Sequence, residues 1–117
     1  MLAYIGDGVY EIFIREFLIG KGIEKVNSLQ KEAIPYVSAK GQARFLDIMI
    51  NDNILSEEEL AIVYRARNHK GSSHPKNTDI ITYKHATGLE ALIGYLYLTK
   101  NTERVQEIMN YIINIEE

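Results

Sequence analysis

Two stretches of this chain are apolar around almost the whole circumference of a helix, and each contains a single charge. Between Leu2 and Tyr10 the only charged residue is Asp7, and between Ala86 and Thr99 the only one is Glu90. A helix that is apolar nearly all round belongs in the centre of a protein. The sequence therefore predicts two central, buried helices, each with a carboxylate in surroundings that disfavour charge.

Helical spacing of apolar residues continues through the rest of the chain, and alternating strand patterns are missing, so we predict an all-α fold. Capping residues mark the helix ends. The predicted helices are Leu2–Ile19, ended by Gly20-Lys21-Gly22; a short helix from an Asn27-Ser28 cap towards Pro35; one starting at Ser38; one from a Ser56–Glu59 capping box to about Arg67; Ala86–Leu98; and one capped by Thr102 that runs through Ile112.

The length of 117 residues predicts a single domain over 1–117. The sequence begins almost inside its first helix, so we expect a short N-terminal segment to be missing. The absence of cysteine excludes disulfides and thiolate metal sites. No apolar run approaches the roughly 20 residues that span a bilayer, and no signal peptide opens the chain. We therefore expect a cytoplasmic protein without a membrane partner.

Charge is distributed unevenly along the chain. The net charge is −3, but residues 65–85 contain five basic side chains and one acid, a local charge of +4 that leaves −7 elsewhere. Residues 69–78 are rich in Gly, Ser, Pro and Asn, which predicts an exposed loop. His69, His74 and His85 lie in the same basic stretch, and we expect all three to be loop residues. Local charge decides where a polyanion docks, so this segment is a candidate nucleic-acid contact.

The two isolated acids have two interpretations. Each could pair with an arginine or cap a neighbouring helix, as buried acids usually do. Alternatively, the pair shares a divalent metal, because an ionised carboxylate in an apolar helix costs several kcal/mol unless a cation compensates it. Oxygen ligands without cysteine favour Mg²⁺ or Mn²⁺ over zinc.

Small residues beside the two acids would let the helix backbones approach closely and bring the carboxylates together: Gly6, Gly8, Gly88, Ala91 and Gly94. Glu11 lies one turn after Asp7 on the same face. It is either a group behind the metal ligands or part of a salt bridge at the rim of the site, and the sequence does not distinguish the two.

Four segments carry a family resemblance. Residues 2–11 (LAYIGDGVYE) resemble the first motif of the ribonuclease III catalytic domain, and residues 89–94 (LEALIG) resemble its second acidic motif. Residues 37–43 (VSAKGQA) and the stretch from RARN at 65–68 to PKNTD at 75–79 resemble the mini-ribonuclease III subgroup. The similarity runs in order through essentially the whole chain.

The resemblance implies an all-helical, homodimeric endoribonuclease that cuts double-stranded RNA with Mg²⁺, for which Mn²⁺ can substitute. It implies a role in maturing the large-subunit ribosomal RNA precursor, and a ribosomal protein that presents this substrate is a candidate partner. The family's catalytic, metal-binding acids fall on Asp7 and Glu90. The alternative is a catalytically silent module of the same fold that binds structured RNA.

The chain departs from ordinary ribonuclease III at two acidic positions, where it has Ala3 and Thr87. We therefore expect Asp7 and Glu90 to be the only direct protein ligands, with Glu11 and Thr87 behind them. The residues expected to bind RNA offer donors for phosphates and 2′-hydroxyls. They are Arg65, Arg67, Asn68, Lys70, Lys76, Asn77 and Thr78.

Overall fold

A computed structural model of the chain describes residues 1–69 and 79–117. Within these ranges every regular element is a helix, which confirms the all-α prediction. The helices are α1 (Leu2–Gly20), α2 (Val26–Val37), α3 (Ala39–Asn51), α4 (Glu57–Arg67), α5 (Ile80–Leu98) and α6 (Thr102–Glu116). In the described part of the chain, no helix has the length and apolarity needed to cross a membrane.

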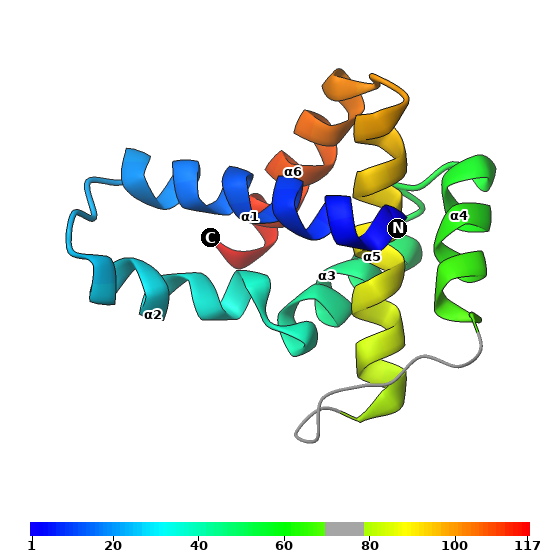
Figure 1. Cartoon of the computed structure of the whole chain (residues 1–117), viewed down its shortest axis with the longest axis horizontal. Coiled ribbons are helices and arrows are strands. Elements are labelled where there is room, and N and C mark those ends of the chain that lie inside the picture. Colours follow the sequence, from blue (N-terminus) through cyan, green and yellow to red (C-terminus); the bar gives the residue numbers. More distant parts are fainter. Residues whose placement is uncertain (70–78) are drawn as a thin grey trace.

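Helix α5 forms the centre of the fold. It packs against α1, α3, α4 and α6, and α1 crosses it near the N-terminus of the chain (Figure 1). The side chains of Leu89, Leu92 and Ile93 on α5 are fully buried. Beyond this crossing, α1 and α2 run side by side as a hairpin that extends to one side of α5 (Figure 1). Only α5 is therefore enclosed as the sequence predicts, whereas α1 lies across its surface.

Two glycines allow the backbones of α1 and α5 to touch. A methyl group at Gly6 would lie 1.7 Å from the carbonyl oxygen of Glu90, and one at Gly94 would lie 2.0 Å from the carbonyl oxygen of Leu2. The prediction that small residues permit close approach is confirmed at these two positions.

The other predicted glycines behave differently. A methyl group at Gly88 would contact Val63 of α4 at 3.2 Å, so this glycine admits α4 rather than α1. At Gly8 the prediction is wrong, because nothing lies within 4 Å of the position a methyl group would take. Gly8 is exposed, on the side of α1 that faces away from α5.

Side-chain caps confirm two of the predicted helix starts. The Ser38 hydroxyl accepts a hydrogen bond from the Gly41 amide at the start of α3, and Ser56 and Glu59 form the predicted capping box of α4. The capping box could be predicted from the sequence because Ser56 and Glu59 are only three positions apart.

Three predicted boundaries are wrong. Helix α2 starts at Val26, so Asn27 and Ser28 lie inside its first turn. Helix α6 is preceded by Asn101, and Thr102 is its first residue. Helix α5 starts six residues before the predicted Ala86, because the Asp79 carboxylate caps it by accepting from the Thr82 amide at 2.9 Å.

An ion pair joins α4 and α6, two helices that are distant in sequence. In this pair Arg104 of α6 donates from Nε and Nη2 to the two carboxylate oxygens of Glu59, each at 2.8 Å, and from Nη2 to the Ile54 carbonyl at 2.7 Å. Glu59 is only 7% exposed. The guanidinium of Arg104 holds the pKa of Glu59 below its ordinary value despite burial, which acts in the opposite direction.

We predict that Gly6→Ala lowers the free energy of unfolding by about 2 kcal/mol or more, because the methyl group cannot be placed without separating α1 from α5. The matched control is Gly8→Ala in the same helix, which should raise it by up to about 1 kcal/mol because an exposed glycine in a helix is replaced by a better helix former. Urea denaturation measures both. Equal effects of the two substitutions would contradict the close crossing.

We predict that Glu59→Gln lowers the free energy of unfolding at pH 7 by about 2–4 kcal/mol, because Arg104 loses a buried, charged partner. The folded-state pKa of Glu59 is depressed, so its contribution is fully present above the unfolded-state pKa and is lost as pH falls through the folded-state pKa. Denaturation curves from pH 7 to pH 3 should therefore show the variant and the wild type converging. A constant difference across this range would contradict the prediction.

Candidate active site

The crossing of α1 and α5 brings Asp7 and Glu90 together. Asp7 directly follows Gly6, whose Cα faces the backbone of Glu90, and the side chains of the two acids lie within hydrogen-bond reach of each other. The predicted pairing of the acids is therefore present. Their predicted burial is not equal: Glu90 is half-buried, but Asp7 is exposed because α1 lies on the surface of α5 rather than inside the fold.

Burial and neighbouring negative charges disfavour the ionised form of Glu90. Its pKa rises to about 8, chiefly through burial, then through the hydrogen bond and the charge of Asp7, with a smaller effect from Glu11. The side chain of Gln42 acts in the opposite direction and favours the charged form. The site thus holds two adjacent carboxyl groups whose repulsion a bound cation would relieve.

Glu11 forms a salt bridge, which is one of the two roles that the sequence left open. Its carboxylate forms a salt bridge with Arg15, one turn further along α1, at 2.8 Å. Its charge also reaches the acidic pair, since it raises the pKa of Glu90. Glu11 therefore adds negative charge at the site while its own carboxylate binds Arg15.

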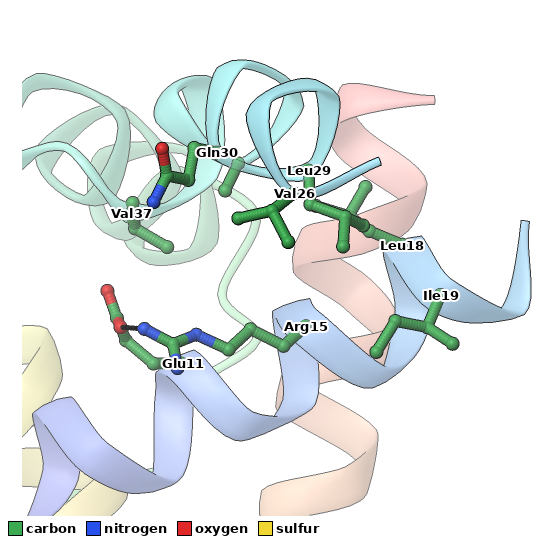
Figure 2. A pocket seen from close by; sticks show the side chains of 9 residues that line it. Glu11, Arg15, Leu18, Ile19, Val26, Leu29, Gln30 and Val37 are labelled. Carbon is green, nitrogen blue, oxygen red and sulfur yellow. Dashed lines mark hydrogen bonds and ion pairs between the residues drawn. The ribbon is translucent and has the colours of Figure 1, made fainter. Parts of the chain in front are cut away.

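A groove of about 340 Å³ between α1 and α2 begins at Glu11 and Arg15 and is otherwise mainly apolar. Figure 2 shows the ion pair of Glu11 and Arg15 on α1, with Leu18 and Ile19 further along the same helix and Val26 and Leu29 on α2. Asp7 and Glu90 do not line this groove. Its lining offers little chemistry for catalysis, so the carboxylate pair remains the candidate site.

Two buried polar residues beside the pair were not predicted from the sequence. Tyr10 is fully buried, and its hydroxyl donates to the Tyr36 carbonyl at 2.7 Å. Burial and the nearby charge of Glu90 raise the pKa of Tyr10 above its ordinary value, so the hydroxyl stays protonated. Gln42 is the second. Its burial could have been predicted from helical periodicity, because it lies on the stripe of α3 that also contains Leu46 and Met49, both fully buried.

Ala3 and Thr87, the two positions at which the chain differs from ordinary ribonuclease III, lie in one hollow. Thr87 and Ala3 line a space of about 340 Å³ together with Arg65 and His69 of the α4 end. The structure thus brings one predicted RNA-binding residue, Arg65, to the same hollow as Thr87.

The other predicted RNA-binding residues are only partly described. The Arg67 guanidinium lies 4.6 Å from the centre of the Tyr64 ring, and Asn68 is the C-cap of α4. Lys70, Lys76, Asn77 and Thr78 lie outside the described residues, as does His74.

The prediction that all three histidines are loop residues is wrong for His85. It lies on α5, and its Nδ1 is 3.3 Å from a carboxylate oxygen of Asp47 on α3. The error follows from the missed Asp79 cap, because the helix begins before this histidine.

The acids available for a metal are few. Across residues 1–69 and 79–117, no three His, Cys, Asp or Glu side chains gather in a cluster that could hold a metal ion. What the described residues offer is the Asp7–Glu90 pair of oxygen donors. This donor set fits a hard divalent cation that keeps much of its hydration shell, such as Mg²⁺.

We predict that Glu90→Gln stabilises the metal-free protein, because it removes a carboxyl group that burial, and then Asp7, make costly to ionise. The folded-state pKa of Glu90 is raised to about 8, so its ionisation penalty is absent below the unfolded-state pKa and develops as pH rises towards and through 8. One pKa unit corresponds to about 1.4 kcal/mol, and we expect a gain of at least about 1 kcal/mol at pH 8 that disappears at pH 4. Urea denaturation in EDTA measures the gain.

The control for this prediction is Glu16→Gln, which neutralises an exposed acid on the outer face of α1 and should leave stability nearly unchanged. Destabilisation by Glu90→Gln would mean that Glu90 makes a structural bond, the first interpretation of the isolated acids.

Comparisons with known proteins agree with the geometry. The family model of the ribonuclease III domain matches residues 1–101. Mini-ribonuclease 3 of Enterococcus faecalis is 46% identical over 112 residues, which cover 96% of this chain and 85% of the relative. Mini-ribonuclease 3 of Brevibacillus brevis is 50% identical over 117 residues, 100% of this chain and 86% of the relative.

A solved crystal structure of a Fusobacterium nucleatum protein superimposes with a TM-score of 0.86 at 37% identity, covering 99% of this chain and 91% of the other. The fold is therefore shared with an experimentally determined structure. By sequence, the chain belongs to the ribonuclease III family, the endoribonucleases that act on double-stranded RNA.

Proposed function

We propose that this chain is a Mg²⁺-dependent endoribonuclease that hydrolyses phosphodiester bonds in double-stranded RNA, with Asp7 and Glu90 as its catalytic, metal-binding residues. The observation that carries the proposal is the contact between these two carboxyl groups at the crossing of α1 and α5. Family members generally depend on divalent metal, and the two acids occupy the motifs that resemble the family's acidic motifs.

Asp7 and Glu90 would hold the cation through their carboxylate oxygens. When bound, the ion supplies activation of water and neutralises charge on the phosphodiester. Asp7 is exposed, so RNA and ion can reach the pair from solvent, while Glu90 anchors it from the half-buried side. Tyr10 stays protonated and bonded to the Tyr36 carbonyl, so it supports α1 rather than exchanging a proton with the substrate.

The RNA would be held by donors next to the pair. Arg65 lines the hollow that includes Thr87, one turn before Glu90 on α5, and Arg67 and Asn68 end the same helix α4. Guanidinium and amide groups suit phosphates and 2′-hydroxyls of an A-form duplex, which is recognised mainly by shape. Lys70, Lys76, Asn77 and Thr78 extend this set in the sequence.

The proposed substrate is the paired region of the large-subunit ribosomal RNA precursor, on the basis of similarity to the mini-ribonuclease 3 proteins of bacteria. This role would require a cytoplasmic location. We further propose that the chain acts as a single catalytic domain in a homodimer. Apolar side chains that α1 leaves exposed support the dimer: Tyr4 is 87% exposed, Ile12 58% and Ile19 59%.

We predict that the purified protein cuts duplex RNA in Mg²⁺ or Mn²⁺, that EDTA abolishes cleavage, and that Asp7→Asn and Glu90→Gln each reduce the rate by about 100-fold or more, the scale expected when a group that stabilises transition-state charge is lost. Glu16→Gln is the matched control and should cut like the wild type. Gel analysis of a labelled duplex, with the paired ends of a ribosomal RNA precursor beside an unrelated duplex, gives the rates.

The alternative function makes a different prediction in the same experiment. A catalytically silent module would bind the duplex with salt-dependent affinity, retain binding in both variants and cut under no divalent ion. Equal cleavage by the wild type and both variants would instead show that the two acids are not the catalytic pair.

A further inference from the structure

Gln42 is a buried polar residue that the proposed chemistry does not yet use. Its side chain is 2% exposed on α3, between Gly41 and Ala43, which are also buried. Its Nε2 has no hydrogen-bond partner of good geometry among the described residues. A buried amide without a partner destabilises a fold, and such groups in native proteins call for an explanation.

Local structure directs Gln42 inwards. The Ser38 hydroxyl accepts from the Gly41 amide at 3.1 Å, and this cap sets where α3 begins. A methyl group at Gly41 would lie 2.0 Å from the Pro35 carbonyl oxygen, so the end of α2 presses directly on the start of α3. Both contacts hold the first turn of α3, and with it the direction of the next side chain, Gln42.

The side chain of Gln42 lies near the acidic pair. Helix α3 packs on α5, and the Gln42 amide lies beside the Glu90 carboxyl, although no hydrogen bond of strict geometry joins the two. The groups near Glu90 on the other neighbouring helix, α1, are the acids Asp7 and Glu11. Glu90 therefore has acids on its α1 side and an amide on its α3 side.

Packing alone does not require an amide at this position. The same stripe of α3 continues with Phe45, Leu46 and Met49, all fully buried and apolar. Leucine has a volume similar to that of glutamine but no polar atoms, and in such surroundings it would remove an unpaired donor. The amide therefore points to a role at the carboxylate rather than in the core.

We propose that Gln42 is a positioning residue for Glu90: its side-chain amide holds the carboxylate in the orientation in which it meets Asp7. This inference rests on the proposed function, because it gives Gln42 a part in presenting the same pair to a divalent ion. It also gives a role to the segment at 37–43, one of the four that carry the resemblance to mini-ribonuclease III.

The test compares Gln42→Leu with Met49→Leu, a matched substitution of a buried side chain of similar volume on the same helix. We expect Gln42→Leu to lower kcat on duplex RNA about 10-fold with a KM within about 2-fold of wild type, and to weaken calorimetric binding of Mn²⁺ about 10-fold, the usual scale for groups that orient a metal ligand. Its melting temperature should be unchanged or higher. Met49→Leu should match the wild type in kcat and Mn²⁺ affinity. Wild-type kcat and Mn²⁺ affinity in folded Gln42→Leu would overturn the proposal.

A second measurement needs no variant of Gln42. In ¹⁵N spectra of the metal-free protein, the Gln42 side-chain amide signal should shift in Glu90→Gln and on addition of Mg²⁺ to the wild type. The amides of Gln30 and Gln106, both exposed, are internal controls that should not move. An unmoved Gln42 signal in both comparisons would overturn the proposal even if Gln42→Leu failed to fold.

The two proposals can fail separately. A wild type that binds Mn²⁺ and shifts the Gln42 amide but leaves duplex RNA intact would contradict the proposed function and support the positioning role. Cleavage that is lost in Glu90→Gln but unaffected in Gln42→Leu would support the function and overturn the positioning role.

Discussion

The contact between the backbones of α1 and α5 determines the geometry of everything near the candidate site. Gly6 faces the carbonyl of Glu90, and Gly94 faces the carbonyl of Leu2, so no side chain separates the two helices at their crossing. Asp7 directly follows Gly6, and Glu90 lies one helical turn before Gly94. The separation of the two carboxylates is thus a consequence of how closely the helices pack, and any residue larger than glycine at the crossing would move one acid away from the other.

This arrangement places a destabilising feature at the crossing of α1 and α5. Burial disfavours the ionised form of Glu90, and the adjacent carboxyl group of Asp7 disfavours it further. Other interactions hold the helices in place: the core around α5, the Glu59–Arg104 ion pair between α4 and α6, and the Tyr10–Tyr36 hydrogen bond between α1 and α2. Functional sites commonly cost stability without their ligand and are held in place by interactions elsewhere in the fold.

The polar residues that interrupt the core gather on the side of Glu90. Tyr10 approaches it from α1 and Gln42 from α3, and both are buried where apolar residues would pack more simply. Glu59 is the charged residue that is buried in the described part of the chain, and its burial is explained by the capping box and by Arg104. The hydroxyl of Tyr10 is paired with the Tyr36 carbonyl, so Gln42 is the buried polar side chain left without a structural explanation, and we interpret it with the site rather than with the core.

The sequence by itself determined the helical class, the Ser38 and Ser56 helix starts and the identity of the two unusual acids, because periodicity, local caps and composition are properties of neighbouring residues. It could not determine the start of α5 at Asp79, since a polar capping residue inside a basic, glycine-rich stretch is ambiguous without the helix it begins. Only the tertiary structure decided that Asp7 is exposed, that Gly8 faces away from α5 while Gly6 touches it, and that Gln42 meets Glu90. These outcomes depend on which face of each helix another helix covers, and that is set by long-range packing rather than by any single segment.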